Sequence, residues 1–178
     1  MKTRVIALGV TGSIAAYKAA ELTSQLAKEG YEVHVLMTAA ALKLVGEQTF
    51  LTLSRRPVVT SLWEIPDWKP GHIDLAERAE LLLVAPCTAN FMGKYAHGVA
   101  DDALTTFALS FTGPALLAPA MNHNMWHHPA VRDNHRTLLA RGVHFVGPGA
   151  GALACGTTGD GRMAEPAEVL AALKGLLP

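Results

Sequence analysis

Residues 4–18 read RVIALGVTGSIAAYK, a short apolar run that leads through a turn of small residues into a helical pattern. An apolar run of this length without alternation is typical of a strand buried on both faces of a parallel sheet. Residues at helical spacing then predict a helix from Ser13 to about Glu29, with Gly30 as its stop. The chain therefore opens with a strand, a tight turn and a helix.

Further short apolar runs, rich in Val, Leu and Ala, follow at residues 32–37, 81–86, 115–119 and 143–146. Longer helix-like segments separate them. This alternation predicts a parallel sheet covered by helices on both faces and connected by right-handed crossovers. The predicted fold class is α/β, a three-layer α/β/α sandwich with a Rossmann-like or flavodoxin-like sheet. A chain of 178 residues suits one domain, residues 1–178.

Composition excludes several classes of protein. Half of the residues are apolar, 17% are charged and the formal net charge is zero, which argues against a disordered chain and against a nucleic-acid binder. No apolar run reaches the roughly 18 residues of a membrane span, and the start lacks a signal-peptide pattern. Cys87 and Cys155 are too few for a disulfide scaffold. We therefore expect a cytoplasmic protein that does not insert into a membrane.

The turn after the first run has the features of a phosphate site. Small residues let backbone N–H groups approach a phosphate, the helix start adds positive potential, and the hydroxyls of Thr11 and Ser13 add donors. The turn matches neither G-x-G-x-x-G nor G-x-x-x-x-G-K-[ST], which argues against dinucleotide and nucleoside-triphosphate sites. The sequence favours a mononucleotide phosphate site over the alternative, a tight turn capped by Ser13.

Polar residues also follow the later strands. Thr88 and Asn90 interrupt an apolar run, and they suit hydrogen bonds to a ring or a ribityl chain as well as a helix cap by Thr88. Thr38, after the second strand, has the same two interpretations. Asp101 or Asp102 is expected to cap a helix over residues 103–110, and Asn122 precedes a short helical turn.

Two stretches depart from the regular pattern. Residues 56–71 contain three prolines and two tryptophans, and residues 147–161 are rich in glycine. Loops beyond the carboxyl ends of parallel strands usually build the ligand crevice. We therefore expect both stretches to act as covers or flaps over an active site.

Taken together, these segments resemble the homo-oligomeric flavin-containing cysteine decarboxylases over nearly the whole chain. The later motifs narrow the resemblance to the branch that decarboxylates phosphopantothenoylcysteine in coenzyme A biosynthesis. The resemblance rests on ordered motifs: GSIAAYK (residues 12–18), GHIDL (71–75), APCTAN (85–90), ADD (100–102), PAMNHNMW (119–126), and ACG (154–156) leading to GRM (161–163).

The resemblance implies FMN as the cofactor and assigns a role to each residue at a motif position. His72 is implied as the catalytic base, Cys155 as a proton donor on a closing clamp, and Asn122 as the ligand of the substrate carboxylate. Further implied substrate contacts are Met125, Ala154, Gly156, Arg162 and Met163. The implied FMN contacts are Gly12, Ser13, Ile14, Thr38, Cys87, Thr88, Ala89, Asn90 and Met125.

The chemistry explains why such groups are needed. Loss of carbon dioxide from an acylated cysteine leaves electrons at a carbon that has no good acceptor. Removal of hydride from the β-carbon and of the thiol proton gives a thioaldehyde, which accepts those electrons as an enethiolate. A flavin supplies the reversible hydride acceptor. His72 suits the base because neutral histidine is abundant near its unperturbed pKa of about 6.5. In isolation, a cap of the helix that follows Gly71 is the favoured role for this histidine, and the motifs taken together reverse that preference.

The resemblance also implies partners. Family members form homotrimers, or dodecamers made of four trimers, with FMN between subunits. Their substrate is a small molecule. In bacteria the domain is often fused to a ligase that makes the substrate, whereas the sequence here stops at Pro178. The resemblance therefore implies either a separate phosphopantothenate-cysteine ligase or a sequence that is one part of a longer bifunctional protein. Many relatives carry an acidic residue after Ala-Cys-Gly, where this sequence has Thr157 and Thr158.

Other functions remain open from the sequence. Within the same fold they are a peptidyl-cysteine decarboxylase and a flavin prenyltransferase; the other classes are a non-catalytic FMN-binding regulatory protein and a simple nucleotide-binding module. The histidines at positions 123, 127, 128 and 135 suggest a metal, but no Cys-x-x-Cys or His-Glu-x-x-His pattern accompanies them. We therefore expect no metal site.

Overall fold

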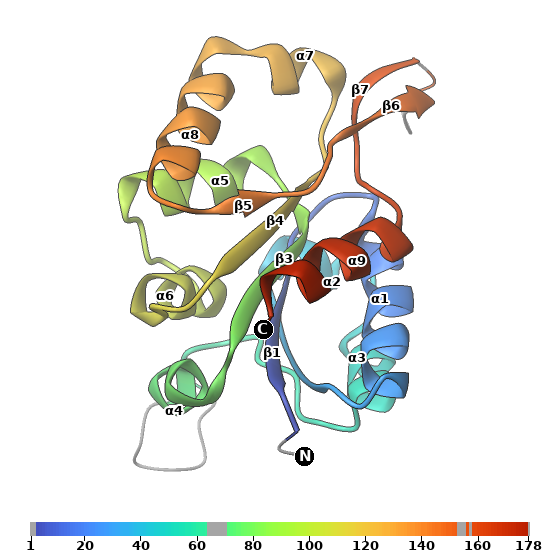
Figure 1. Cartoon of the computed structure of the whole chain (residues 1–178), viewed down its shortest axis with the longest axis vertical. Coiled ribbons are helices and arrows are strands. Elements are labelled where there is room, and N and C mark those ends of the chain that lie inside the picture. Colours follow the sequence, from blue (N-terminus) through green and yellow to red (C-terminus); the bar gives the residue numbers. More distant parts are fainter. Residues whose placement is uncertain (1–2, 64–70, 153–155, 157, 178) are drawn as a thin grey trace.

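The structure, a computed structural model, describes residues 3–63, 71–152, 156 and 158–177. Its centre is a parallel sheet of five strands in the order β2-β1-β3-β4-β5 (Figure 1). The strands are β1 (Val5–Val10), β2 (Glu32–Met37), β3 (Leu81–Cys87), β4 (Ala115–Pro119) and β5 (His144–Phe145). The predicted α/β class is confirmed, with strand bounds that differ from the predicted ones by at most a residue or so at each end.

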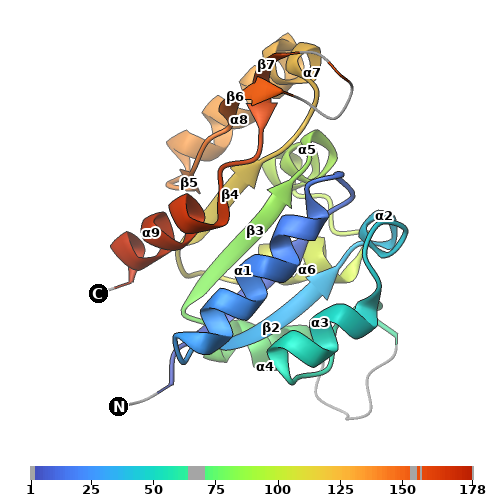
Figure 2. The ribbon, with the colours of Figure 1, turned by 90° about the vertical axis from the view of Figure 1, so that its right-hand side faces the viewer.

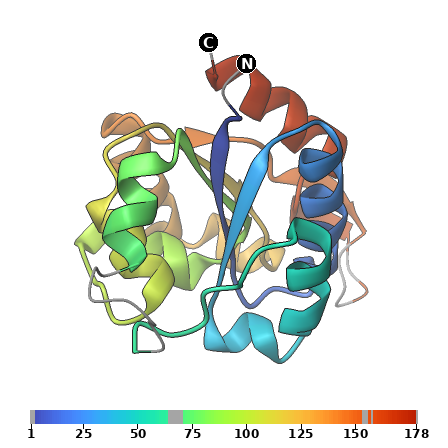
Figure 3. The same cartoon turned by 90° about the horizontal axis from the view of Figure 1, so that it is seen from below.

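Helices cover both faces of the sheet, as seen from below in Figure 3. The helices are α1 (Ala16–Lys28), α2 (Ala39–Leu42), α3 (Glu47–Ser54), α4 (Gly71–Arg78), α5 (Ala89–His97), α6 (Ala103–Ser110), α7 (His123–His127), α8 (Pro129–Ala140) and α9 (Pro166–Leu176). Side chains from α1, α3 and α9 pack on one face, and side chains from α4, α5, α6 and α8 pack on the other.

The sequence of β1 explains this sandwich. Ile6, Leu8 and Val10 point into the core under α1, while Val5 and Ala7 point into the core on the opposite face. Successive side chains of a strand alternate between faces, so a strand covered on both sides must be apolar throughout. All six residues of β1 are buried, so its sequence lacks the alternation of apolar and polar residues that marks a strand with one solvent-exposed face.

Local sequence sets several helix ends. Asp102 caps α6 in a capping box with Thr105, and Pro129 occupies the first turn of α8, as expected. The predicted start of the first helix at Ser13 is wrong, because α1 begins at Ala16. The backbone N–H of Ser13 donates to the carbonyl of Thr11, and the Ser13 carbonyl accepts from the N–H of Ala16, so these residues form a turn before the helix.

The two irregular stretches differ from each other. Residues 56–63 include Val59, which pairs beside Leu36 at the edge of β2, and residues 64–70 lie outside the described part of the chain. Residues 147–161 are more regular than expected, since β6 (Gly149–Ala152) pairs antiparallel with β7 (Thr158–Arg162). We call β6 and β7 the ribbon. It stands apart from the sheet, near α7 (Figure 1).

None of the described helices has both the length and the apolar character needed to cross a bilayer.

Candidate functional site

A cleft of about 500 Å³ opens at the carboxyl ends of the central strands. Its walls come from the segments that follow β1, β2, β3 and β4 and from the first turns of α5 and α6. It is lined by Thr11, Gly12, Ser13, Thr38, Ala39, Ala40, Thr88, Ala89, Asn90, Phe91, Lys94, Asp102, Thr105, Ala120, Met121 and Met125. The strand order reverses between β1 and β3, and α/β sheets bind ligands in the crevice beyond the carboxyl ends at such a point.

The turn after β1 offers backbone donors to this cleft. Within the described residues, the N–H groups of Gly12 and Ile14 have no protein acceptor, and the turn leads into the positive end of the 13-residue helix α1. Backbone N–H groups at a helix start are suited to bind an anion. The predicted role of this turn in phosphate binding is consistent with its geometry.

Thr11 has a different role from the one expected of a phosphate donor. Its buried hydroxyl donates to the carbonyl of Pro86 at 2.7 Å and accepts from the backbone N–H of Thr88 at 3.1 Å. The only proton of the hydroxyl is therefore used within the protein. Thr11 holds the segment after β1 against the segment after β3, so that both present their backbones to the same cleft.

Gly12 lets the segments after β1 and β2 approach closely. A Cβ atom at this position would lie 2.4 Å from the Cβ of Ala40 and 3.3 Å from its Cα. Real Cβ atoms do not approach that closely, so any side chain at position 12 would push the two segments apart. The width of the cleft at this wall therefore depends on a glycine.

We expect Gly12→Ala to reduce the bound flavin in the purified protein by at least about tenfold, because the added methyl displaces the donors of the turn. The ratio of flavin to protein absorbance measures this. Gly46→Ala is the matched control, since a Cβ there meets nothing within 4 Å. The double variant Gly12→Ala, Ala40→Gly relieves the closest contact and should recover most of the flavin. Normal flavin content in Gly12→Ala would contradict this account of the wall.

The polar residues after β2 and β3 prove to be helix caps that also line the cleft. Thr38 Oγ1 accepts from the N–H of Ala41 at 3.3 Å, and Thr88 Oγ1 accepts from the N–H of Phe91 at 3.4 Å. The two interpretations of each threonine are therefore compatible, since the hydroxyl oxygen caps a helix while its proton serves a second acceptor. Ala89 and Asn90 line the cleft beside Thr88.

The far wall of the cleft contains a charged pair that sequence reasoning missed. Lys94 Nζ lies 2.7 Å from Asp101 Oδ1 and 3.8 Å from Asp102 Oδ2, and Lys94 and Asp102 both line the cleft. The hydrogen bond from Lys94 lowers the pKa of Asp101. The motif ADD marked this region, but the lysine lies in the preceding helix, where it resembles an ordinary surface residue.

The segment after β4 supplies Met121 and Met125 to the cleft. Between them, Asn122 caps α7, with its Oδ1 accepting from the N–H of Asn124 at 2.8 Å. The expected N-cap is thus present, and the carboxylate-binding role proposed for Asn122 concerns its amide Nδ2.

Several residues predicted to bind ligands do not line the cleft of the single chain. The side chain of Ile14 is 62% exposed, and its backbone N–H belongs to the turn after β1. Met163 is buried in the core, and its carbonyl accepts a hydrogen bond from Lys18 Nζ. Arg162 pairs with Glu165. Gly156 is exposed with a φ of 83°, in the left-handed region that favours glycine.

Cys87 is fully buried, and burial raises the pKa of its thiol strongly. A thiol in such surroundings stays protonated and unreactive. It does not line the cleft, although the next residue along the chain does. Its position favours packing over flavin contact, the two roles that the sequence left open.

The helix that carries His72, one of the two predicted catalytic residues, lies away from the cleft. His72 is the second residue of α4, which lies near the amino ends of the strands (Figures 1 and 2). The cleft lies at the carboxyl ends of the strands. At the other end of α4, Arg78 Nη1 lies 3.5 Å from Oε1 of Glu32, the first residue of β2. This ion pair places that end of α4 beside the amino end of β2. Ala154 and Cys155 lie outside the described residues, between β6 and β7.

Comparison with known proteins gives close relatives. The chain is 45% identical over 173 residues to the coenzyme A biosynthesis bifunctional protein CoaBC of Bacillus subtilis, and it covers 42% of that protein's length. It is 42% identical over 166 residues to a probable phosphopantothenoylcysteine decarboxylase of Streptococcus mutans, covering 92% of this chain and 93% of the relative. The chain thus spans less than half of the bifunctional relative and nearly all of the shorter one.

Solved structures give the same picture. A cysteine-to-serine variant of a PPC decarboxylase, in complex with pantothenoylaminoethenethiol, matches with a TM-score of 0.87 and 29% identity over 97% of each chain. The FMN-dependent cysteine decarboxylase SpaF matches with a TM-score of 0.78 and 31% identity over 97% of this chain and 98% of that one. The model of the Flavoprotein family matches residues 1–177. This chain, with its parallel sheet and its cleft at the carboxyl ends, belongs to the Flavoprotein family.

Proposed function

We propose that this protein catalyses the FMN-dependent decarboxylation of 4′-phosphopantothenoylcysteine to 4′-phosphopantetheine, a step of coenzyme A biosynthesis. The observation that carries the proposal is the 42% identity to a probable phosphopantothenoylcysteine decarboxylase over nearly the full length of both chains. The fold match to a PPC decarboxylase that holds pantothenoylaminoethenethiol supports the same substrate class.

The cleft fits FMN by size and by its donors. Its volume of about 500 Å³ lies in the usual range of cofactor sites. The N–H groups of Gly12 and Ile14 and the hydroxyl of Ser13 would bind the phosphate, next to the start of α1. Thr38, Thr88 and Asn90 would bind the polar parts of the ring and the ribityl chain, and Ala89 and Met125 would pack on the ring. The bound flavin would supply a reversible two-electron acceptor.

The protein's own residues would bind the substrate and move its protons. Asn122 Nδ2 would donate to the substrate carboxylate and would add no full charge. A full positive charge would stabilise the carboxylate of the ground state too strongly. His72 would take the thiol proton, and Cys155 would return a proton at the end of the reaction. Gly156, beside the clamp cysteine, supplies a left-handed backbone position that suits a sharp turn of the clamp.

We further propose that a working site forms between two copies of the chain. The cleft lies at the carboxyl ends of the strands. Because α4 lies near their amino ends (Figure 2), one chain would need a large rearrangement to bring His72 to its own cleft. A neighbouring chain that presents its α4 to this cleft would complete the site. The proposed oligomer is a homotrimer, or a dodecamer made of four trimers, in the cytoplasm. A separate ligase that makes the substrate is part of the same proposal.

The test is identification of the product by mass. We expect the FMN-loaded protein to convert phosphopantothenoylcysteine to phosphopantetheine, and to act at least about 100-fold more slowly on a peptide that ends in cysteine, because a cleft built for one acyl group loses contacts to another. The peptide matters because SpaF, a cysteine decarboxylase, shares the fold. Preference for the peptide would mean that a peptide is the substrate in place of phosphopantothenoylcysteine. Absence of both reactions would refute the proposed decarboxylase activity.

A further inference from the structure

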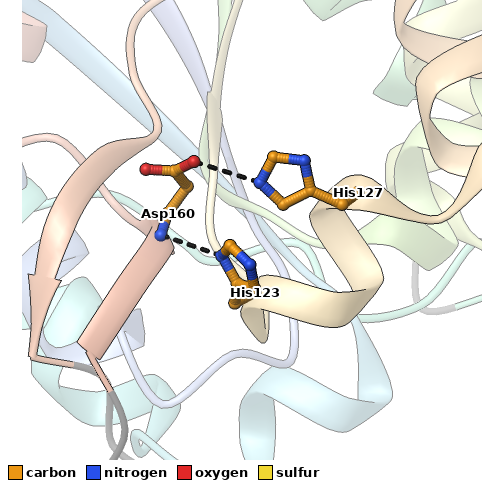
Figure 4. A group of neighbouring side chains, drawn as sticks. All are labelled: His123, His127 and Asp160. Atoms are coloured by element: carbon orange, nitrogen blue, oxygen red, sulfur yellow. Dashed lines mark hydrogen bonds and ion pairs between the residues drawn. The ribbon is translucent and has the colours of Figure 1, made fainter.

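Three potential metal ligands from distant parts of the sequence meet between α7 and the ribbon. His123 and His127 lie one helical turn apart on α7, and Asp160 lies on β7 (Figure 4). One ligand atom from each residue can be chosen so that all three lie within 4.8 Å of one another. Figure 4 shows both imidazole rings turned toward the aspartate.

The distance between His127 and Asp160 is close to the spacing of two ligands on one metal ion. His127 Nε2 lies 3.0 Å from Asp160 Oδ2, and the centroids of the two imidazole rings lie 4.4 Å apart. Two ligands that each lie about 2.0–2.2 Å from a tetrahedral Zn²⁺ are separated by roughly 3.3–3.6 Å, a few tenths of an ångström more than the His127–Asp160 distance. An ion placed beside the His127–Asp160 contact would therefore bind both groups with little movement.

The backbone holds these side chains in position without an ion. The N–H of Met121 donates to the carbonyl of Gly161 at 2.9 Å, which fixes β7 against the start of α7. A Cβ at Gly161 would lie 2.2 Å from the carbonyl oxygen of Met121, so this close approach needs glycine. The N–H of Asp160 donates to His123 Nδ1 at 3.2 Å, which means that Nδ1 is unprotonated and its lone pair is present.

We propose that His123, His127 and Asp160 bind a divalent transition-metal ion of the zinc class, which links α7 to the ribbon. Two imidazole nitrogens and one carboxylate oxygen form a donor set that zinc prefers, whereas magnesium and calcium prefer oxygen alone. The side chains of His127 and Asp160 are about half exposed, so water can reach the ion and fill its remaining positions. The ion would replace the hydrogen bond from Asp160 N–H to His123.

The sequence alone argued against this site for a clear reason. The two histidines have the i, i+4 spacing of a helical chelate, but the third ligand follows 33 residues after His127 in a stretch that reads as a glycine-rich loop. The fold brings Asp160 to α7, where the N–H of Met121 donates to the carbonyl of Gly161 and the N–H of Asp160 donates to His123 Nδ1. The site uses none of the cleft residues, so it stands independently of the proposed decarboxylation.

Calorimetric titration of the FMN-loaded protein with zinc chloride tests the proposal. We expect one Zn²⁺ per chain with a Kd of about 10 µM or lower, and no heat from magnesium chloride under the same conditions. His127→Ala and Asp160→Asn should each weaken zinc binding at least about tenfold. His144→Ala is the matched control, because it removes an exposed histidine on β5 and should leave the Kd unchanged.

Cys155→Ser provides the second control, since a thiol is a strong zinc ligand. Unchanged binding in this variant supports the site, and loss of binding there would assign the zinc to the cysteine and overturn the proposal. Equal affinity in the wild-type protein, His127→Ala and Asp160→Asn would overturn it as well. Thermal unfolding without metal checks that each variant folds, and Asp160→Asn, which keeps the size of the side chain, guards against a loss caused by misfolding.

Discussion

His72→Asn is expected to lower kcat for phosphopantothenoylcysteine by about 10³-fold while the protein keeps its full content of FMN. Asparagine keeps hydrogen-bonding capacity at this position but does not accept a proton near neutral pH, and loss of a general base typically costs 10²- to 10⁴-fold. FMN should stay bound because the segments that line the cleft do not include α4, and because asparagine keeps a hydrogen-bonding group where a neighbouring chain's α4 would meet the cleft. Product formation and flavin absorbance measure the two effects separately.

The matched control for this variant is His144→Asn, the same substitution at an exposed histidine on β5. It should retain wild-type turnover. Normal turnover in His72→Asn would remove the residue from its proposed role. Loss of FMN together with activity would instead mean that His72 supports the cofactor site.

Coexpression of two defective chains extends the test to the proposed site between subunits. His72→Asn supplies an intact cleft, and Gly12→Ala supplies an intact His72. If the two parts of one site come from different chains, random mixing should restore about a quarter of the wild-type sites. No recovery in mixed oligomers would argue that each chain completes its own site, through a rearrangement of α4.

The sequence predicted the framework well because burial leaves a direct signature. β1, β3 and β4 are buried along their whole length, and such strands appear as uninterrupted apolar runs. The turn at Gly12 was recognised for the same kind of reason, since small residues between a strand and a helix have few other uses. Both features depend on residues that are adjacent in the chain.

Contacts between distant residues were beyond this reasoning. Lys18 appears in the sequence as one position of an amphipathic helix, yet its side chain is buried and its Nζ lies 3.0 Å from Glu165 Oε1, 147 residues later. That hydrogen bond lowers the pKa of Glu165 and fastens α1 to the segment after β7. A buried lysine is unfavourable unless it is paired, and only the fold supplies the pair.

The ribbon was missed because glycine hides a strand. Residues 147–161 contain six glycines, which predicts a loop, and β6 itself alternates glycine with alanine. Pairing with β7 depends on backbone hydrogen bonds, for which the side chains give no signal. For the same reason, the sequence did not indicate Asp160 as a candidate metal ligand.

Cys155→Ser is expected to stop the reaction after decarboxylation, so that an oxidised enethiol accumulates in place of phosphopantetheine. A serine hydroxyl is a far weaker acid than a thiol, whose unperturbed pKa is about 8.5, so the final proton would not be delivered. A cysteine-to-serine variant of a PPC decarboxylase was captured with pantothenoylaminoethenethiol, a compound at that oxidation level. Mass spectrometry should find a product about 2 Da lighter than phosphopantetheine.

Cys87→Ala is the matched control, because it removes the buried thiol of β3 and leaves Cys155 in place. Burial raises the pKa of the Cys87 thiol, so this thiol does not serve as the proton donor. It should release phosphopantetheine of normal mass, with some loss of stability from the small cavity that it creates. Normal product from Cys155→Ser would show that another group or water delivers the proton. Loss of all decarboxylation in that variant would move Cys155 to an earlier step, because a residue needed only for the last proton transfer leaves carbon dioxide release intact.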